Sequence, residues 1–201
     1  MKFKTFFVIA ILCFSCQSTK SQDGRKTIVC DLPSNVQDYK KWLEIDAAYI
    51  ITKQEKETYL KLQINEDRQK FIDNFWERRD PNPDTEENEF KEEHYNRIAF
   101  ANENFASGIW GWKTDRGLIY ILFGKPDKID KGRADFEDLK NVSFETWSYN
   151  FLYEIGSDVK LTFTALTENS EFRLPKEKRE KILKLSGARL TTCFMCPQIF
   201  L

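Results

Sequence analysis

The segment from Gly108 to Gly124 brings together side chains that could recognise a ligand. Its sequence is Gly-Ile-Trp-Gly-Trp-Lys-Thr-Asp-Arg-Gly-Leu-Ile-Tyr-Ile-Leu-Phe-Gly. Trp110 and Trp112 offer aromatic faces, and Asp115, which could also pair with Arg116, offers a carboxylate at the mouth of a groove. The same residues suit a structural corner, in which tryptophan fills the core and Asp115 caps the turn, because aromatic side chains mostly serve packing. We favour the corner and keep ligand recognition as the alternative.

Three arginines could form a fork that binds an anion, since a guanidinium can hold a carboxylate or phosphate through two parallel hydrogen bonds. They are Arg79, Arg97 and Arg116. The alternative, which we favour, is a structural network of ion pairs with the acids Asp80, Glu89 and Asp115. Asp80 also suits an Asx-type turn at the end of a helix. The candidate binding residues are therefore Arg79, Asp80, Arg97, Trp112, Asp115 and Arg116.

His94 is the only histidine in the chain. It could act in acid–base catalysis with a carboxylate such as Glu89, Glu93 or Asp115. It falls on the apolar stripe of a predicted helix, however, which favours a partly buried core histidine. The sequence contains neither the His-Glu-x-x-His zinc motif nor a Gly-x-Ser-x-Gly nucleophile elbow. We therefore predict no catalytic residue, no metal site and no cofactor.

The composition excludes several classes of protein. A net charge of -1 argues against a nucleic-acid binder, which needs a strong positive field. An aromatic content of 14% is too high for a disordered chain. Removal of an export signal would leave about 180 residues, which is enough for one domain with a hydrophobic core.

The N-terminal half has the periodicity of helices. A Thr52–Glu55 capping box opens one helix, Asn65 could cap the next, and the longest helix starts at Asp84 or Thr85. Its apolar residues, His94 among them, recur at helical spacing along one face. The helices that we predict are 39–45, 52–62, 66–79, 84–105 and, after Pro175, a final helix over 176–185.

The C-terminal half favours strands. We predict strands over 118–123, 145–153 and 159–166, a short fourth strand over 171–174, and a polar connection over 131–141. A β-like run also occurs at 48–51. Helices followed by strands indicate an α+β fold, with a helical N-terminal half packed on a small antiparallel sheet of three to four strands.

The first residues are typical of an export signal. Lys2 and Lys4 precede an apolar stretch over 6–14 that is too short to span a membrane as a helix. Ser15 then precedes Cys16 as in a loose lipobox, which predicts that Cys16 becomes the acylated N-terminus. An ordinary secretory peptide cleaved near Ser15 is the alternative. The predicted organisation is a signal peptide over 1–15, a tether and extended arm over 16–37, one domain over 38–187 and an apolar tail over 188–201.

Three further cysteines are Cys30, Cys193 and Cys196. Two of the three could form a disulfide in an exported protein, but an odd number leaves one thiol over. Their pairing and role stay open.

The segment Gly111-Trp-Lys-Thr-Asp115 resembles the signature of the GWxTD-domain family of bacterial cell-envelope proteins. The resemblance extends to Phe75-Trp-Glu-Arg-Arg-Asp-Pro81 and to Ile119-Tyr-Ile-Leu-Phe-Gly124, and it runs from Trp42 to Lys184. It implies a location in the cell envelope. It supplies no agreed activity and no catalytic residues.

Together these observations predict a cell-envelope lipoprotein, held in the membrane through Cys16 on the periplasmic or surface side. We expect a non-catalytic binding or assembly module that engages an envelope protein partner and no nucleic acid. The alternative is a periplasmic hydrolase that uses carboxylates with or without His94.

Overall fold

The computed structural model describes residues 19–20, 26–27, 36–136, 139–153, 155–167 and 170–192, with side chains described over 38–135, 140–153, 155–167 and 170–186. The chain divides into two compact units, Met1–Pro33 and Ser34–Leu201. In the first unit, within the predicted tether and extended arm, β1 (Thr19–Lys20) pairs antiparallel with β2 (Lys26–Thr27). The predicted export signal, Cys16, Cys30, Cys193 and Cys196 lie outside the described residues.

Helices make up the first part of the second unit, as predicted. Thr52 caps α2 through a complete capping box, because its hydroxyl accepts from the Glu55 N–H at 3.2 Å while Glu55 Oε2 accepts from the Thr52 N–H at 3.0 Å. The elements in order are α1 (Val36–Lys41), the π-helical η1 (Trp42–Asp46), α2 (Lys53–Lys61), α3 (Asn65–Glu77) and α4 (Glu89–Asn104).

Two predicted helix starts and one predicted strand in this part were wrong. The helix expected from Asp84 or Thr85 begins at Glu89, because Asn88 is the residue whose side chain caps it, at 2.8 Å from the Lys91 N–H. Asn65 is the first residue of α3 rather than its cap. The run 48–51 forms a turn and not a strand, and the Ile51 N–H bonds to the Ala47 carbonyl at 2.8 Å.

The largest difference from the sequence prediction concerns 118–123, which is helix and not strand. Helix α5 (Asp115–Phe123) is capped by Thr114, whose hydroxyl accepts from the Gly117 N–H at 3.0 Å, and it ends at Gly124 with a φ of +75°. Its apolar residues are buried on more than one side, so the run has neither a strand nor a helix period. A short apolar run of this kind cannot be assigned by periodicity.

The sheet is three-stranded and antiparallel, in the order β3-β4-β5. The predicted strands over 145–153 and 159–166 are confirmed as parts of β4 (Leu139–Leu152) and β5 (Gly156–Ala165). The third strand, β3 (Lys128–Phe136), falls largely in the predicted polar connection, and its charged sequence suits the edge of a sheet. The predicted fourth strand is a single bridge between Thr164 and Arg173, which precedes α6 (Lys176–Thr192).

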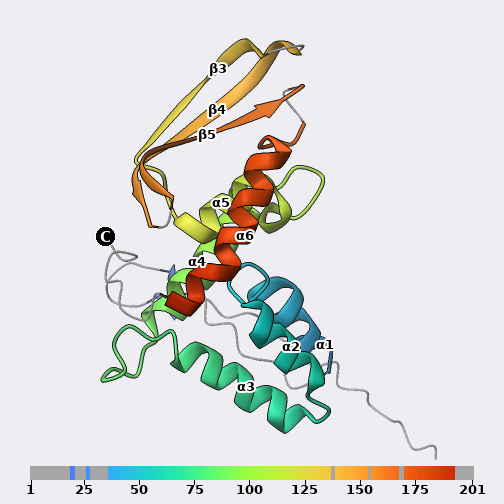
Figure 1. The fold of residues 1–201 in the computed structure, drawn as a ribbon, viewed down its shortest axis with the longest axis vertical. Helices are drawn as coiled ribbons and strands as arrows, with labels where there is room; N and C mark the ends of the chain where they lie inside the picture. The colour runs from blue at the N-terminus through green and yellow to red at the C-terminus, as the bar shows by residue number, and fades with distance from the viewer. Residues whose placement is uncertain are drawn as a thin grey trace, which may run out of the picture. The chain divides into compact units, whose positions relative to one another are not determined.

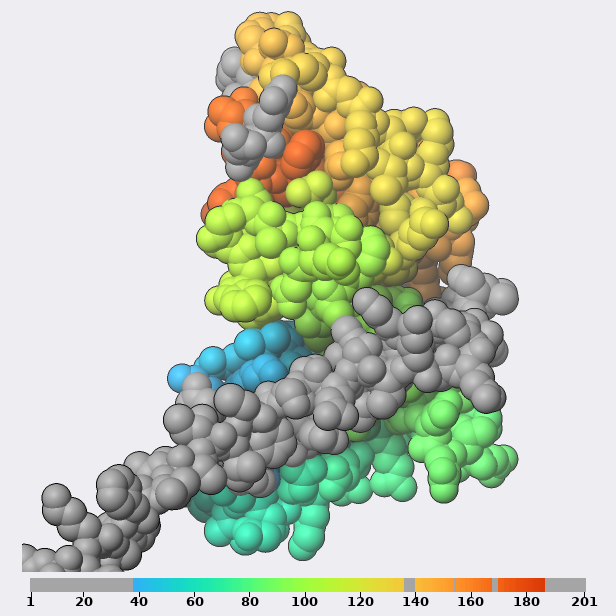
Figure 2. All heavy atoms as spheres, turned by 180° about the vertical axis from the view of Figure 1, so that it is seen from behind, coloured from blue at the N-terminus to red at the C-terminus, as the bar shows by residue number. Residues whose placement is uncertain are grey.

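The α+β class is therefore confirmed, and the fold has two hydrophobic cores. One core joins the sheet to α4, α5 and α6 around Trp147, Phe163 and Ile119. The other joins α1, η1, α2 and α3 around Trp42 and Phe75. Helices α4, α5 and α6 lie between the sheet and the helices α1 to α3 (Figure 1). The view from behind shows the same order, with the α4–α5 junction in the middle (Figure 2). Among the described residues, no helix is both long and apolar enough to cross a membrane.

Two glycines allow the backbone to pack closely where α4 meets α5. A Cβ atom on Gly111 would overlap the carbonyl of Ala101 in α4, and a Cβ atom on Gly117 would overlap the carbonyl of Gly111. The obstacles are backbone atoms, which cannot move aside as a flexible side chain can. Glycine at both positions is therefore required by the contact itself.

We expect Gly111→Ala to destabilise the protein by about 3 kcal/mol or more, because the new methyl group must push α4 away from the turn. Urea unfolding followed by circular dichroism measures the loss. Gly108→Asn is the matched control, since Gly108 has a φ of +68° with open space around it and asparagine tolerates that backbone. A stability loss equal to that of the control would contradict the close-packing argument.

Candidate functional site

The signature segment Gly111–Asp115 is mostly buried. Its first three residues form the 3-10 turn η2 (Gly111–Lys113), and the Trp112 ring packs in the core that joins the sheet to the helices. The Trp112 N–H bonds to Asn102 Oδ1 at 3.1 Å, and its carbonyl accepts from the Tyr49 hydroxyl at 3.0 Å. Trp112 thus fills the core, as the structural-corner interpretation predicted.

Thr114, and not Asp115, caps the turn. It is buried, accepts from the Gly117 N–H, and donates its hydroxyl proton to the Gly111 carbonyl at 2.7 Å. A threonine hydroxyl can accept and donate at once, so one side chain starts α5 and closes η2. The sequence prediction assigned this capping role to the wrong residue.

Asp115 instead connects α5 to the end of the domain. Its side chain is buried, with Oδ1 at 2.7 Å from Arg179 Nε and Oδ2 at 2.8 Å from the Leu174 N–H. Both oxygens are therefore occupied by groups some sixty residues further along the chain. Asp115 is also the first residue of α5, where the positive end of the helix dipole stabilises a carboxylate.

Arg116 pairs with Glu145 of the central strand. Its Nη1 lies 3.3 Å from Glu145 Oε2, and the guanidinium stands over the rings of Phe105 and Phe172 at 5.1 and 4.5 Å. Burial acts to raise the pKa of Glu145, but hydrogen bonds and charges from Lys131 and Arg116 outweigh it and hold that pKa below its ordinary value. The carboxylate is therefore ionised and joins α5, β3 and β4.

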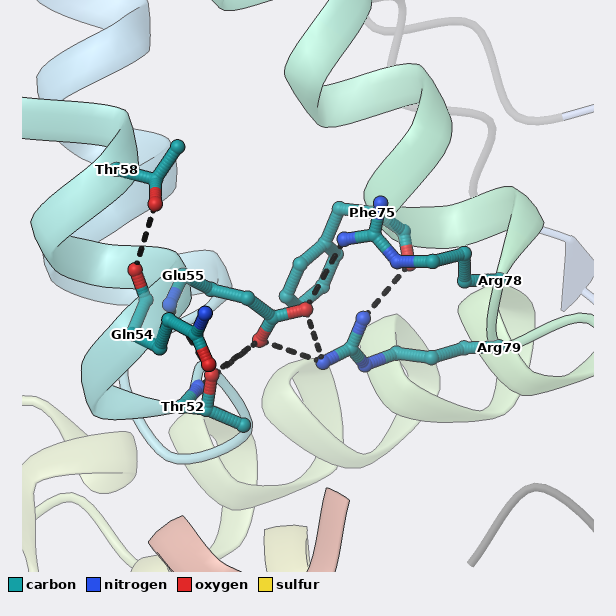
Figure 3. Close-up of polar contacts among 7 residues, drawn as sticks. All are labelled: Thr52, Gln54, Glu55, Thr58, Phe75, Arg78 and Arg79. Carbon is teal, nitrogen blue, oxygen red and sulfur yellow. Dashed lines mark hydrogen bonds and ion pairs between the residues drawn. The ribbon is translucent and has the colours of Figure 1, made fainter. Parts of the chain in front are cut away.

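Arg79 joins α3 to α2 beside the core formed by α1, η1, α2 and α3 (Figure 3). Its Nη2 contacts both carboxylate oxygens of Glu55 at 2.9 and 2.8 Å, its Nη1 donates to the Phe75 carbonyl, and the guanidinium lies 3.6 Å from the Phe75 ring centre. Arg78 adds a third bond to Glu55, at 3.1 Å. Burial alone would raise the pKa of Glu55, but the Thr52 N–H and the charge of Arg79 lower it overall. Glu55, which completes the capping box of α2, thus also holds the end of α3.

The other two candidate residues have separate partners. Arg97 Nε binds Glu93 Oε1 at 2.7 Å on the same helix, and its guanidinium would touch a Cβ atom placed on Gly124 of α5. Asp80 Oδ1 accepts from the Asn82 N–H at 3.0 Å, which gives the Asx-type turn that the sequence predicted.

The arginine fork is therefore not assembled. The three arginines pair with three different carboxylates, and these are not the acids that the sequence suggested; the partners are Glu55, Glu93 and Glu145. Asp115 pairs with Arg179 of α6, which is not among the candidate residues predicted from the sequence. Glu93 lies one helical turn from Arg97, but the other pairs join residues at least 24 positions apart, so no local signal could identify them.

His94 is buried in the core, as predicted. It is 4% exposed, its ring stacks on Phe90, and its Nε2 lies 2.5 Å from the Asp46 carbonyl, which requires Nε2 to carry the proton. Burial lowers its pKa from 6.5 to about 4, so the ring is neutral near pH 7. A histidine enclosed in this way does not reach solvent. Across the described residues, no group of three or more His, Cys, Asp or Glu side chains could hold a metal ion.

The structure also shows an exposed apolar pair, Ile109 and Trp110, that is not among the six candidate binding residues. Trp110 is 66% exposed and Ile109 is 43% exposed, directly before the signature. Sequence alone did not separate Trp110 from Trp112, because the two tryptophans are only two residues apart.

The fold and these contacts define a domain whose signature residues hold its helices and sheet together. The model of the GWxTD domain matches residues 13–183, so the chain belongs to the GWxTD-domain family. No curated protein and no solved structure matches it.

We expect Asp115→Ala to cost about 2–3 kcal/mol, because it leaves the buried Leu174 N–H without an acceptor and Arg179 without its carboxylate. Arg179→Ala alone is expected to cost about 1 kcal/mol, since its side chain is 39% exposed and Asp115 keeps the Leu174 bond. A double-mutant cycle by urea unfolding tests the pair. A coupling energy near zero would mean that the ion pair does not stabilise the fold.

We expect stability to fall between about pH 6.5 and pH 4, because the unfolded chain protonates His94 in this window while the folded chain does not. The shift of that pKa to about 4 corresponds to a loss on the order of 3 kcal/mol across the window. Asp46, whose pKa is raised by burial, changes the stability in the opposite direction. This residue is present in both the wild type and the variant described next, so it does not affect their comparison.

His94→Gln is the variant to compare with the wild type, because glutamine can still donate to the Asp46 carbonyl and does not titrate. Unfolding free energies measured at pH 7 and pH 5 should differ clearly less in this variant. An unchanged difference would assign the pH dependence to other groups.

Proposed function

We propose that this protein is a non-catalytic cell-envelope lipoprotein that acts as a binding or assembly module. The observation that supports binding is the exposure of Ile109 and Trp110 directly before the signature segment Gly111–Asp115, in which only Lys113 is exposed. Removing apolar surface from water is favourable, so an exposed indole on a well-held turn is suited to contact a partner. The ligand recognised by this turn is an envelope component.

The internal contacts of the polar site residues favour binding over catalysis. Arg79, Asp115 and Arg116 hold other elements of the fold, and their charged groups face carboxylates or guanidinium groups of the same chain. The alternative is a periplasmic hydrolase that uses carboxylates with or without His94. If His94 takes part, it must reach the substrate. His94 is buried and neutral, which argues against that role.

The proposed location rests on the sequence. Lys2 and Lys4, a short apolar stretch and Ser15-Cys16 support export and acylation of Cys16. Several acyl chains on one cysteine would anchor the protein stably, whereas one chain binds only marginally. The domain would then work on the periplasmic or surface side of the membrane.

A photo-crosslinking amino acid at position 110, expressed in cells, tests the binding role. We expect discrete adducts to a protein or a lipid from this position. Leu60, which is exposed to a similar extent at 61%, is the control position and should give none. The absence of adducts from position 110 in a folded, exported protein would contradict the binding role.

Cys16→Ala should move the protein from the membrane fraction to the soluble fraction, and retention in the membrane would contradict the lipid anchor.

A further inference from the structure

Trp110 differs from every other tryptophan of this chain. All five tryptophans lie among the described residues, and Trp42, Trp76, Trp112 and Trp147 are at most 9% exposed. Trp110 is 66% exposed, and its neighbour Ile109 is 43% exposed. Two adjacent apolar side chains therefore project from the turn between α4 and η2.

The turn that carries them is held by backbone contacts on both sides. The Lys113 N–H bonds to the Trp110 carbonyl at 2.9 Å, and the Ser107 N–H bonds to the Ile109 carbonyl at 3.2 Å. Gly111 follows at once and packs against the carbonyl of Ala101. Because the backbone is already ordered, a partner of Ile109 and Trp110 would bind without the entropy cost of fixing a flexible loop.

The turn itself carries one positive charge. Lys113 is the only charged residue between Asn104 and Thr114. It is exposed, and its ammonium group lies 5.1 Å from the centre of the Trp112 ring. A lysine beside exposed tryptophan and isoleucine matches a surface that has negative phosphates above an apolar layer.

We propose that Ile109 and Trp110 insert into the surface of the lipid bilayer to which the chain is tethered, with Lys113 at the lipid phosphates. This inference rests on the proposed lipid anchor at Cys16. Tryptophan is suited to the membrane interface, because its large ring is apolar while its N–H can bond to water or headgroups. A protein interface of ordinary size buries about 800 Å² on each partner, which is far more than two side chains at the end of a turn present.

The tether makes such a small contact effective. Cys16 and Val36, the first residue of α1, are 20 positions apart in the sequence, and even a fully extended chain of that length reaches only about 70 Å. An anchored domain therefore stays close to the bilayer, and its second contact becomes intramolecular. The turn would set which side of the domain faces the membrane.

Fluorescence of the acylated full-length protein in vesicles tests the insertion. The vesicles contain phosphatidylethanolamine and phosphatidylglycerol with bromine on the upper part of the acyl chains, where it quenches a nearby indole. The signal of Trp110 is the difference between the wild type and Trp110→Phe. We expect this signal to fall to less than half in brominated vesicles and to shift to shorter wavelength.

A matched control places the indole elsewhere on the same protein. Leu60→Trp in the Trp110→Phe background puts it at a residue of α2 that is 61% exposed in the native chain, and its fluorescence should be unchanged by bromine. Thermal unfolding should show that both variants remain folded.

Three outcomes would overturn the inference. Equal quenching at positions 60 and 110 would mean that the turn has no preferred contact with lipid. No quenching of Trp110 in protein that remains on the vesicles would exclude insertion while leaving the anchor and the binding role intact. A protein that carries no acyl chain would remove the anchor itself, and with it this inference.

Discussion

The carboxylate of Asp115 is the contact on which the C-terminal part of the domain depends. Between Asp115 and its partners Leu174 and Arg179 the chain forms the rest of α5 and the whole sheet. Closing a segment of this length has an entropy cost that must be offset where its ends meet. One buried side chain with a charged and a backbone partner does this with defined geometry, which apolar packing alone does not provide. The chain that leads into the sheet and the chain that leaves it are therefore joined at the start of α5.

Two further pairs follow the same physical pattern. Arg79 joins the start of α2 to the end of α3 through Glu55, and Arg116 joins α5 to β4 through Glu145. In each pair the guanidinium also lies on an aromatic ring. A buried ion pair adds little net stability compared with apolar residues, since both charges lose water, but removal of one partner is costly. These pairs therefore fix how neighbouring elements meet. This explains why residues whose types suggest a ligand site instead hold the elements of the fold together.

The sequence predicted what local patterns determine. The class, the capping box at Thr52 and the two longer strands follow from the spacing of nearby residues. Helix α5 was mistaken for a strand because its apolar run has no period, and its helical state is fixed by the Thr114 cap together with neighbours on several sides. Strand β3 was missed because its charged residues become a strand only by pairing with β4. Likewise the charged candidate residues could be picked out from the sequence, but their partners could not, because these lie up to sixty-four positions away.

The contacts that fix the turn at Gly111 separate the two tryptophans beside it. Gly111 packs on the Ala101 carbonyl and the Trp112 N–H binds Asn102, so the second tryptophan is directed into the core. The first tryptophan, Trp110, lies on the other side of this glycine and is 66% exposed. A corner needs only one of the two rings, and a polar residue at position 110 would satisfy the same backbone contacts. An indole held in water is unfavourable by the hydrophobic effect, and this supports the proposal that the membrane surface covers Trp110.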